Sequence, residues 1–142
     1  MKISTKGRYS TRAMLDLAMH SDNGLVQVRD ISKRIAVSER YLELLLTPLR
    51  LAGLVKAYRG ANGGFALTRH PSMIRLSEII QALEGPTAPV ECVDNAETCL
   101  RSTSCAAHQV WAEIKEAVDV VLESTTLQDM VERQRKLDAC SQ

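Results

Sequence analysis

Three of the four cysteines and one of the three histidines lie within a single stretch, residues 92–108. The spacing is C-x6-C-x5-C-x2-H, and the four residues are Cys92, Cys99, Cys105 and His108. Small and polar residues fill the gaps, which is typical of a loop. Thiolates and imidazoles are ligands that soft metal ions and iron–sulfur clusters take. The sequence therefore predicts an inorganic centre held by this loop.

The spacing alone leaves the kind of centre open. Structural zinc sites usually carry paired ligands two to four residues apart, whereas here only Cys105 and His108 are that close. Wide gaps favour a larger object, and four ligands satisfy a two-iron cluster, whose potential rises when imidazole replaces thiolate. A zinc site and a cluster-free thiol switch are the alternatives. Cys140 is distant in the sequence and is interpreted as incidental.

Composition and hydropathy set the class of protein. With 142 residues, of which 45% are hydrophobic and 25% charged, the chain has the composition of a globular protein. No apolar run is long enough to span a membrane, and the N-terminus lacks the apolar stretch of a signal peptide. We therefore expect no membrane association and a cytoplasmic location, where clustered cysteines more often bind metal or sense redox state than form disulfides.

Charge is divided unevenly along the chain, although the net charge is only +1. Residues 1–60 contain eleven Lys or Arg against five Asp or Glu, and residues 61–142 contain seven against twelve. A basic half suits a polyanion such as nucleic acid. The sequence contains no Ser/His/Asp set and no phosphate-binding loop, and its carboxylates are scattered, so we predict that the protein is not an enzyme.

Two short helices joined by a tight turn are predicted at residues 28–35 and 39–52, after a first helix that begins near residue 5. Ser38 is a good N-cap for the second of the pair, and Gly53 suits its C′ position. This is the helix-turn-helix pattern, in which polar residues of the second helix can reach base edges in the major groove. The buried face comprises Leu42, Leu45, Leu46 and Leu49, and the exposed face Glu39, Arg40, Glu43, Thr47 and Arg50.

Two features of these helices have more than one interpretation. Pro48 lies inside the second helix and is expected to kink it or to end it early. Lys6 and Arg8, at the start of the first helix, either contact DNA phosphates or remain solvated surface residues.

A β-hairpin is predicted next. Residues 54–58 and 65–68 suit two strands, and Asn62-Gly63 between them is a strong turn signal because both residues tolerate positive φ. A hairpin directly after a helix-turn-helix is a wing. Arg59, at its base, is placed to enter a narrow minor groove, where negative potential attracts a guanidinium. An isolated hairpin with a solvated arginine is the alternative.

Helices are also predicted in the second half of the chain. One over residues 76–83 is expected to be capped by Ser77, a long one runs from about residue 106 to residue 124, and Thr126 begins a last one. The long helix has a wide apolar stripe that a second copy of the chain would cover, forming a homodimer. Packing on its own winged domain is the alternative. The stripe comprises Val110, Ile114, Ala117 and Val121, with Trp111, Val118 and Leu122 alongside.

Together these elements predict a mainly α fold with a small β-hairpin wing: a winged helix-turn-helix domain plus a long dimerisation helix. We expect a DNA-binding domain over residues 1–85, a Cys/His cluster-binding loop over residues 86–108, and the dimerisation and C-terminal helices over residues 106–137.

Taken in order, the motifs resemble the IscR-type iron–sulfur cluster regulators of bacteria, members of a winged-helix repressor superfamily. The similarity spans nearly the whole chain. It is carried by Ser4-Thr5-Lys6-Gly7-Arg8-Tyr9, Tyr41-Leu42-Glu43, Gly53-Leu54-Val55, and Arg59-Gly60 leading to Gly63-Gly64, followed by the three-cysteine loop and the long helix. Arg40 and Leu44 depart from the pattern of the family, which bears on the DNA sequence preferred.

The resemblance implies a homodimeric regulator that binds double-stranded operator DNA and controls cluster-assembly genes. It implies a 2Fe–2S cluster held by the four residues Cys92, Cys99, Cys105 and His108. It also places Ser38, Arg40, Tyr41 and Glu43 in the major groove and Arg59 in the minor groove. Two alternatives remain. One is an electron carrier or cluster-transfer protein, whose basic half docks an acidic protein partner. The other is a winged-helix regulator that uses zinc or thiols instead of a cluster.

Overall fold

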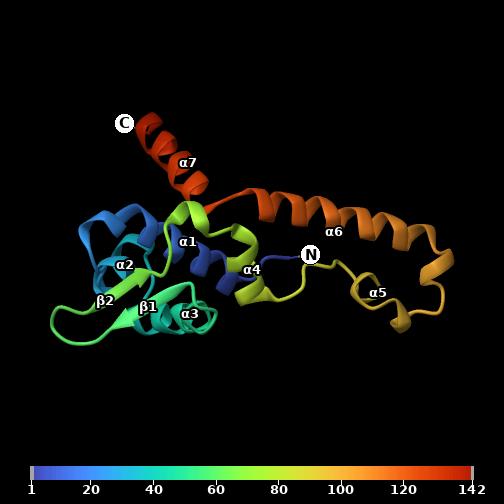
Figure 1. The fold of residues 1–142 in the computed structure, drawn as a ribbon, viewed down its shortest axis with the longest axis horizontal. Coiled ribbons are helices and arrows are strands. Elements are labelled where there is room, and N and C mark those ends of the chain that lie inside the picture. Colours follow the sequence, from blue (N-terminus) through green and yellow to red (C-terminus); the bar gives the residue numbers. More distant parts are fainter. Residues whose placement is uncertain (1, 142) are drawn as a thin grey trace.

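Helix α1 (Thr5–His20) is the element against which most of the other helices pack in the computed structural model, which describes residues 2–141 (Figure 1). Ser4 caps it, because the Ser4 hydroxyl accepts the backbone N–H of Gly7 at 3.0 Å. Met14 and Leu17 are fully buried on this helix, and α2, α3, α4 and α7 all contact it.

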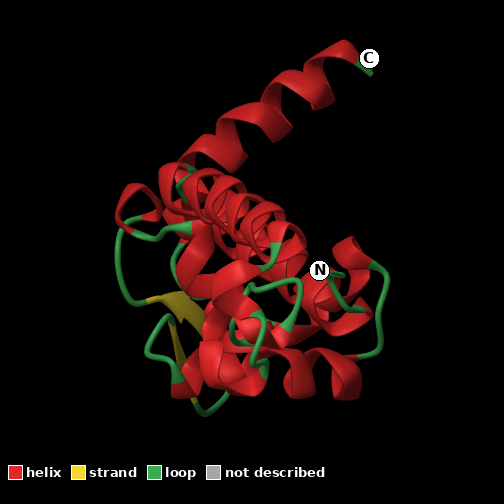
Figure 2. Cartoon of the chain, turned by 90° about the vertical axis from the view of Figure 1, so that its right-hand side faces the viewer, coloured by secondary structure: helices red, strands yellow, loops and turns green. Residues whose placement is uncertain are grey.

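The other elements follow the predicted order. The helices are α2 (Val28–Ile35), α3 (Glu39–Leu51), α4 (Leu76–Glu84), α5 (Glu91–Asp94), α6 (Ala106–Ser124) and α7 (Leu127–Cys140). Strands β1 (Val55–Tyr58) and β2 (Gly64–Leu67) pair antiparallel, with Val55 opposite Leu67. Short 3-10 turns are η1 (Ser21–Asn23), η2 (Pro71–Met73), η3 (Ala96–Thr98) and η4 (Ser102–Ser104). Helices dominate the fold (Figure 2), which confirms the predicted mainly α fold with a hairpin.

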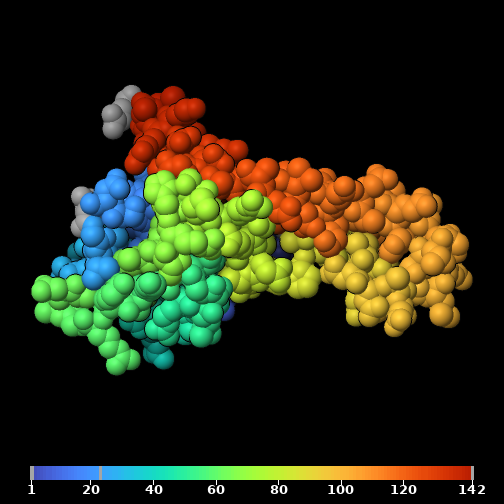
Figure 3. All heavy atoms as spheres, in the orientation of Figure 1, coloured from blue at the N-terminus to red at the C-terminus, as the bar shows by residue number. Residues whose placement is uncertain are grey.

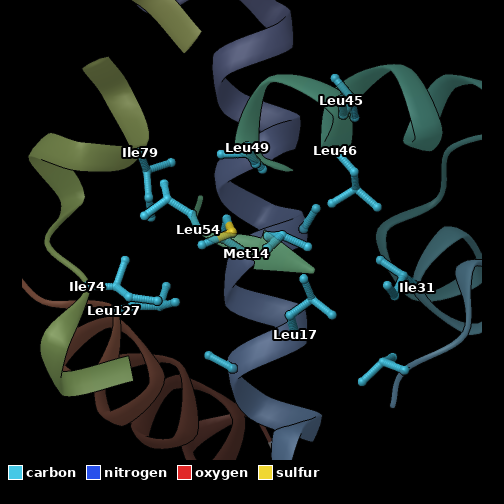
Figure 4. Packing of buried hydrophobic residues seen from close by; sticks show 14 of the residues in the cluster. Met14, Leu17, Ile31, Leu45, Leu46, Leu49, Leu54, Ile74, Ile79 and Leu127 are labelled. Carbon is cyan, nitrogen blue, oxygen red and sulfur yellow. The ribbon is translucent and has the colours of Figure 1, made fainter. Parts of the chain in front are cut away.

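One apolar core joins the first and last helices of the chain (Figure 4). The predicted buried face of α3 is confirmed, because its four leucines are at most 1% exposed. The core also receives side chains from α7 and from the segment before α4. Its members include Met14, Leu17, Ile31, Leu42, Leu45, Leu46, Leu49, Leu54, Ile74, Ile79, Leu127 and Val131.

The structure excludes one of the two alternatives at Pro48 and shows that the predicted cap at Ser77 was wrong. Pro48 does not end α3 early, because the helix continues to Leu51. The carbonyl that proline leaves without a helical partner is that of Leu44, and Leu44 is 61% exposed, so water can satisfy it. Ser77 is not the cap of α4. The helix begins at Leu76 with Arg75 as its N-cap residue, and the Glu78 carboxylate accepts the backbone N–H of Arg75 at 2.9 Å.

An ion pair fixes α2 against α1. The Asp16 carboxylate is 8% exposed and accepts two hydrogen bonds from the Arg34 guanidinium, at 2.7 and 2.8 Å. The hydrogen bond that Arg34 donates to Asp16 raises the pKa of the guanidinium. This bidentate contact sets where the helix-turn-helix sits on the rest of the core.

Replacing Asp16 with alanine should lower the free energy of unfolding by about 2 kcal/mol, because it removes hydrogen bonds to a charged partner and leaves a cavity at a buried position. Urea unfolding followed by circular dichroism measures the change. Asp22 is exposed, so Asp22→Ala is the matched control and should shift stability by less than about 0.5 kcal/mol. Equal effects of the two substitutions would contradict a structural role for the pair.

Helix α6 forms an arm that extends from the core (Figures 1 and 3). It packs on α4 near the core and on α5 further out. Leu122 is its buried side chain, whereas Val110, Trp111, Ile114 and Val121 remain 38–60% exposed. Among residues 2–141, no helix combines the length and the apolar character needed to cross a membrane.

Candidate nucleic-acid interface and cysteine loop

Local backbone features set the start of α3. Ala36 adopts a left-handed conformation with φ 58°, which makes the tight connection after α2. The Ser38 hydroxyl then accepts the backbone N–H of Tyr41 at 3.1 Å, which confirms the predicted N-cap. Arg40 and Glu43 are exposed on the following turn, while Tyr41 is half-buried. The polar side chains of the first turns of α3 are therefore free to contact a ligand.

The wing is anchored at its base. Val26, just before α2, exchanges two backbone hydrogen bonds with Phe65 of β2, at 2.7 and 2.9 Å. Gly63 is required in the turn, because a Cβ there would lie 2.2 Å from the Tyr58 carbonyl oxygen. These constraints hold Arg59, which follows β1, at a fixed place relative to α2 and α3.

An open groove of about 540 Å³ lies between α3, the wing and the N-terminal end of α2. Glu43 and Arg59, both predicted DNA contacts, line the same groove from α3 and from the wing. Arg29 and Arg50 line it as well. Three arginines and one glutamate give the lining a net positive charge, which suits a polyanion.

The predicted DNA contacts lie in three places, and Ser38, Arg40 and Tyr41 are at the start of α3, outside the lining of the groove. Glu43 and Arg59 lie in the groove, whereas Lys6 and Arg8 are exposed on the first turns of α1. The Tyr9 and Tyr41 rings meet edge to face, with centroids 6.2 Å apart, so the start of α1 lies beside the start of α3.

The contribution of α2 to the groove was not predicted from the sequence. Gln27 and Arg29 line the groove from the start of α2. The sequence pattern predicts that Ile31 is buried. It does not predict which element the exposed side of α2 faces. The packing of α2 on α1 and α3 decides that.

The cysteine loop brings together two of its four predicted ligands. Cys92 lies in α5 and His108 in the first turn of α6, and Cys92 Sγ is 3.3 Å from His108 Nδ1. Cys105 is the N-cap residue of α6 and is half-buried, and Cys99 is exposed. Within residues 2–141, no three His, Cys, Asp or Glu side chains lie close enough together to hold a metal ion. The donor chemistry fits a soft metal or cluster, and the Cys92–His108 pair fits two of its positions.

A polar contact ties the chain before the cysteine loop to α6. Asp119 accepts hydrogen bonds from the Thr87 hydroxyl at 2.5 Å and from the Lys115 ammonium at 2.6 Å. The hydrogen bond from Lys115, together with that from Thr87, lowers the pKa of Asp119, and the hydrogen bond to Asp119 raises the pKa of Lys115. This contact, which we call the Thr87 latch, holds the entry to the loop against the middle of α6.

The Thr87 latch should contribute to stability in a defined pH range. A carboxyl whose pKa is lowered by folding stabilises the native state fully above its ordinary pKa of 3.8, and this contribution is lost as the pH falls through the lower folded value. The difference in Tm between the wild type and Asp119→Asn should therefore be constant near neutral pH and shrink below 3.8. A difference that persists in acid would contradict an electrostatic origin.

Known regulators resemble this chain over most of its length. The family model Rrf2, described as iron-dependent transcriptional regulator, matches residues 3–133. The regulator CymR of Bacillus subtilis (strain 168) is 45% identical over 130 residues, which cover 92% of this chain and 89% of CymR. The regulator IscR of Xenorhabdus nematophila is 38% identical over 138 residues, which cover 97% of this chain and 84% of that protein.

Solved structures agree with these relatives. The structure of CymR, described as the global cysteine regulator of B. subtilis, superposes with a TM-score of 0.82 at 43% identity and covers 94% of this chain and 98% of that chain. The structure of T. potens IscR gives a TM-score of 0.76 at 40% identity and covers 94% and 88%. The winged-helix fold predicted from the sequence is thereby confirmed.

Proposed function

The chain belongs to the Rrf2 family of transcriptional regulators, and from this we propose that it is a cytoplasmic homodimer that binds operator DNA and senses iron–sulfur cluster status through a 2Fe–2S cluster. Its relatives are regulators rather than enzymes, which bears out the expectation of a non-enzyme. The same relatives lend no support to an electron carrier. By the resemblance noted above, the controlled genes are those of cluster assembly.

The groove between α3 and the wing supports the DNA-binding part of the proposal. Glu43 lines it from α3, and Ser38, Arg40 and Tyr41 lie at the start of the same helix, the part of a recognition helix that contacts base edges. Arg59 lines the same groove from the wing, which supports the proposal that it enters the adjacent minor groove. Lys6 and Arg8 are assigned to phosphates, because both are exposed on the neighbouring helix.

A salt titration tests DNA binding. If basic residues contact phosphates, the logarithm of the binding constant for a duplex should fall steeply with the logarithm of salt concentration, with a slope of roughly −0.9 per phosphate contacted. Fluorescence anisotropy with a labelled duplex measures it. Absence of binding to any duplex at low salt would overturn the proposal.

The contact between Cys92 Sγ and His108 Nδ1 is the observation that carries the cluster proposal. It joins α5 to the first turn of α6 and brings a thiol against an imidazole, the mixed donor set of the predicted centre. Cys99 and Cys105 would complete the ligand set. A bound 2Fe–2S cluster would supply a labile inorganic centre whose presence reflects the supply of iron and sulfide.

The side chains of the chain itself suggest how the loop communicates with the DNA-binding half. Ligation by Cys92 and His108 would fix α5 on α6, and the Thr87 latch holds the preceding segment on the same helix. Further back, the Glu84 carboxylate accepts the Ser4 backbone N–H at 2.9 Å and the Ser4 hydroxyl at 2.6 Å. The position of the loop is thus linked, through the end of α4, to the start of α1 beside α3.

Anaerobic purification tests the cluster. The proposal expects about two iron and two acid-labile sulfide per subunit, together with visible absorption. Zinc in place of iron would support a zinc-based regulator. Protein that lacks metal even after anaerobic purification and reconstitution would contradict the cluster.

A second candidate is a regulator of cysteine metabolism that senses thiols without a cluster. The similarity to CymR favours it, because that identity of 45% exceeds the 38% shared with IscR of X. nematophila. The metal analysis separates the two candidates, since a thiol sensor would respond to oxidant with no iron bound.

A further inference from the structure

Two arginines flank one tyrosine ring at the start of α1. The guanidinium carbon of Arg8 lies 5.7 Å from the centroid of the Tyr9 ring, and that of Arg12 lies 5.6 Å from it. Both distances are within the range of a cation–π contact. Arg8 and Arg12 are four residues apart, so they project from the same side of the helix. The ring therefore holds two like charges at fixed places.

This arrangement carries a charge that the protein itself does not neutralise. Within residues 2–141, neither guanidinium is paired with a carboxylate. Like charges four residues apart disfavour a helix, and the face of an aromatic ring offsets only part of that cost. Both side chains are exposed, whereas Tyr9 is half-buried. The cluster is thus built to present two cations to a negatively charged ligand.

The cluster lies beside the start of α3. Tyr9 contacts Tyr41 edge to face, with an interplanar angle of 79°, and Tyr41 is the third residue of α3. The Ser10 hydroxyl also donates to the Leu45 carbonyl at 3.4 Å, which keeps the two helices together. A major groove is only about 12 Å wide, so a helix beside the one that enters it faces the flanking phosphates.

We propose that Arg8 and Arg12 each contact a DNA phosphate beside the groove that α3 enters, and that Tyr9 is the positioning residue that fixes both guanidiniums. This inference rests on the proposed DNA-binding function and extends it, because Arg12 becomes a DNA contact and Tyr9 acts on DNA only through its neighbours. Phosphate contacts of this kind set the register of a protein on the duplex without reading sequence.

The first test compares salt dependence. Full-length protein is titrated against a fluorescent duplex of mixed sequence between about 50 and 200 mM salt. Arg12→Gln should make the slope of log K against log salt shallower by roughly 0.9 for each subunit that contacts the duplex. Arg135, exposed on α7, which Figure 1 shows well away from α3, provides the control Arg135→Gln, which should leave the slope unchanged.

The second test isolates the role of Tyr9. Tyr9→Leu removes the ring and should weaken duplex binding severalfold, whereas Tyr9→Phe retains the ring and should bind like the wild type. In protein that already carries Arg8→Gln and Arg12→Gln, Tyr9→Leu should have no further effect. A merely structural role would instead weaken binding equally in both backgrounds. Thermal unfolding of each variant identifies any that do not fold, and Arg12→Gln, a surface change, keeps the test valid in that case.

The outcomes separate this inference from the function on which it rests. If the wild type binds no duplex at low salt, DNA binding itself is wrong, and the inference falls with it. If the wild type binds with a steep salt dependence while Arg12→Gln and Arg135→Gln give the same slope, the arginine contact alone is overturned. If Tyr9→Leu weakens binding regardless of the two arginines, the positioning role is overturned.

Discussion

Replacing Val121 with aspartate is expected to convert the proposed homodimer into monomers and to lower the affinity for a two-half-site operator by roughly 10²-fold or more, since two linked contacts become one. Val121 belongs to the apolar stripe of α6, of which Val110 and Ile114 are 48% and 39% exposed. The face that α6 turns to its own chain carries Leu122 and Asp119 instead. A partner helix would bury the stripe, and a carboxylate there would be desolvated without a partner.

The neighbouring residue provides a matched control. Val120 is 59% exposed and Val121 is 60% exposed, but they point in directions about 100° apart around the helix. Val120→Asp makes the same change in charge and in helix propensity, and it should leave the oligomeric state unaltered. Sedimentation equilibrium measures the association, and anisotropy with an operator duplex measures the affinity. Equal behaviour of the two variants would exclude the stripe as the dimer contact.

Replacing Cys92 with alanine is expected to abolish the visible absorption of anaerobically purified protein and to weaken binding at a cluster-assembly promoter by about 5- to 150-fold, the usual range of allosteric coupling. The substitution removes the thiol that contacts His108 and so releases α5 from α6. Loss of the cluster ligand and loss of the contact with His108 should both weaken DNA binding.

Cys140 is the natural control for this experiment. It is exposed at the end of α7, at the opposite end of α6 from the loop (Figure 1). Cys140→Ala should retain the absorption and the DNA affinity of the wild type. Promoter occupancy that is unchanged in Cys92→Ala, with and without oxygen, would rule out regulation through the loop.

The limits of helices and strands that depend on neighbouring residues in the sequence were predicted well. The long helix was expected over residues 106–124 and is observed as Ala106–Ser124. The start of α7 at Thr126 was predicted, and a capping box forms there, because the side chains of Thr126 and Asp129 each accept the backbone N–H of the other residue. The strands were predicted to within one residue. The turn between them was predicted wrongly, because φ is positive at Gly60 and Gly64 and not at Asn62 or Gly63.

Features that depend on packing between elements were not predictable. The place of Arg29 in the groove follows from how α2 docks, and the contact between Cys92 and His108 follows from how α5 folds back on α6. The sequence did not distinguish among the four candidate ligands. In the structure, Cys92 contacts His108, whereas Cys99 is exposed. The roles of the site residues, the domain boundaries and the homodimer remain predictions.

The shared core of α1 and α7 has a consequence for how the protein is made. A chain leaves the ribosome N-terminus first, so α1 emerges before α7 supplies its partner residues Leu127 and Val131. Until then, the part of α1 that α7 covers in the folded protein remains exposed. The core should therefore be completed only after α7 has been synthesised, and messages truncated before α7 should yield polypeptides that proteases remove, rather than stable shortened proteins.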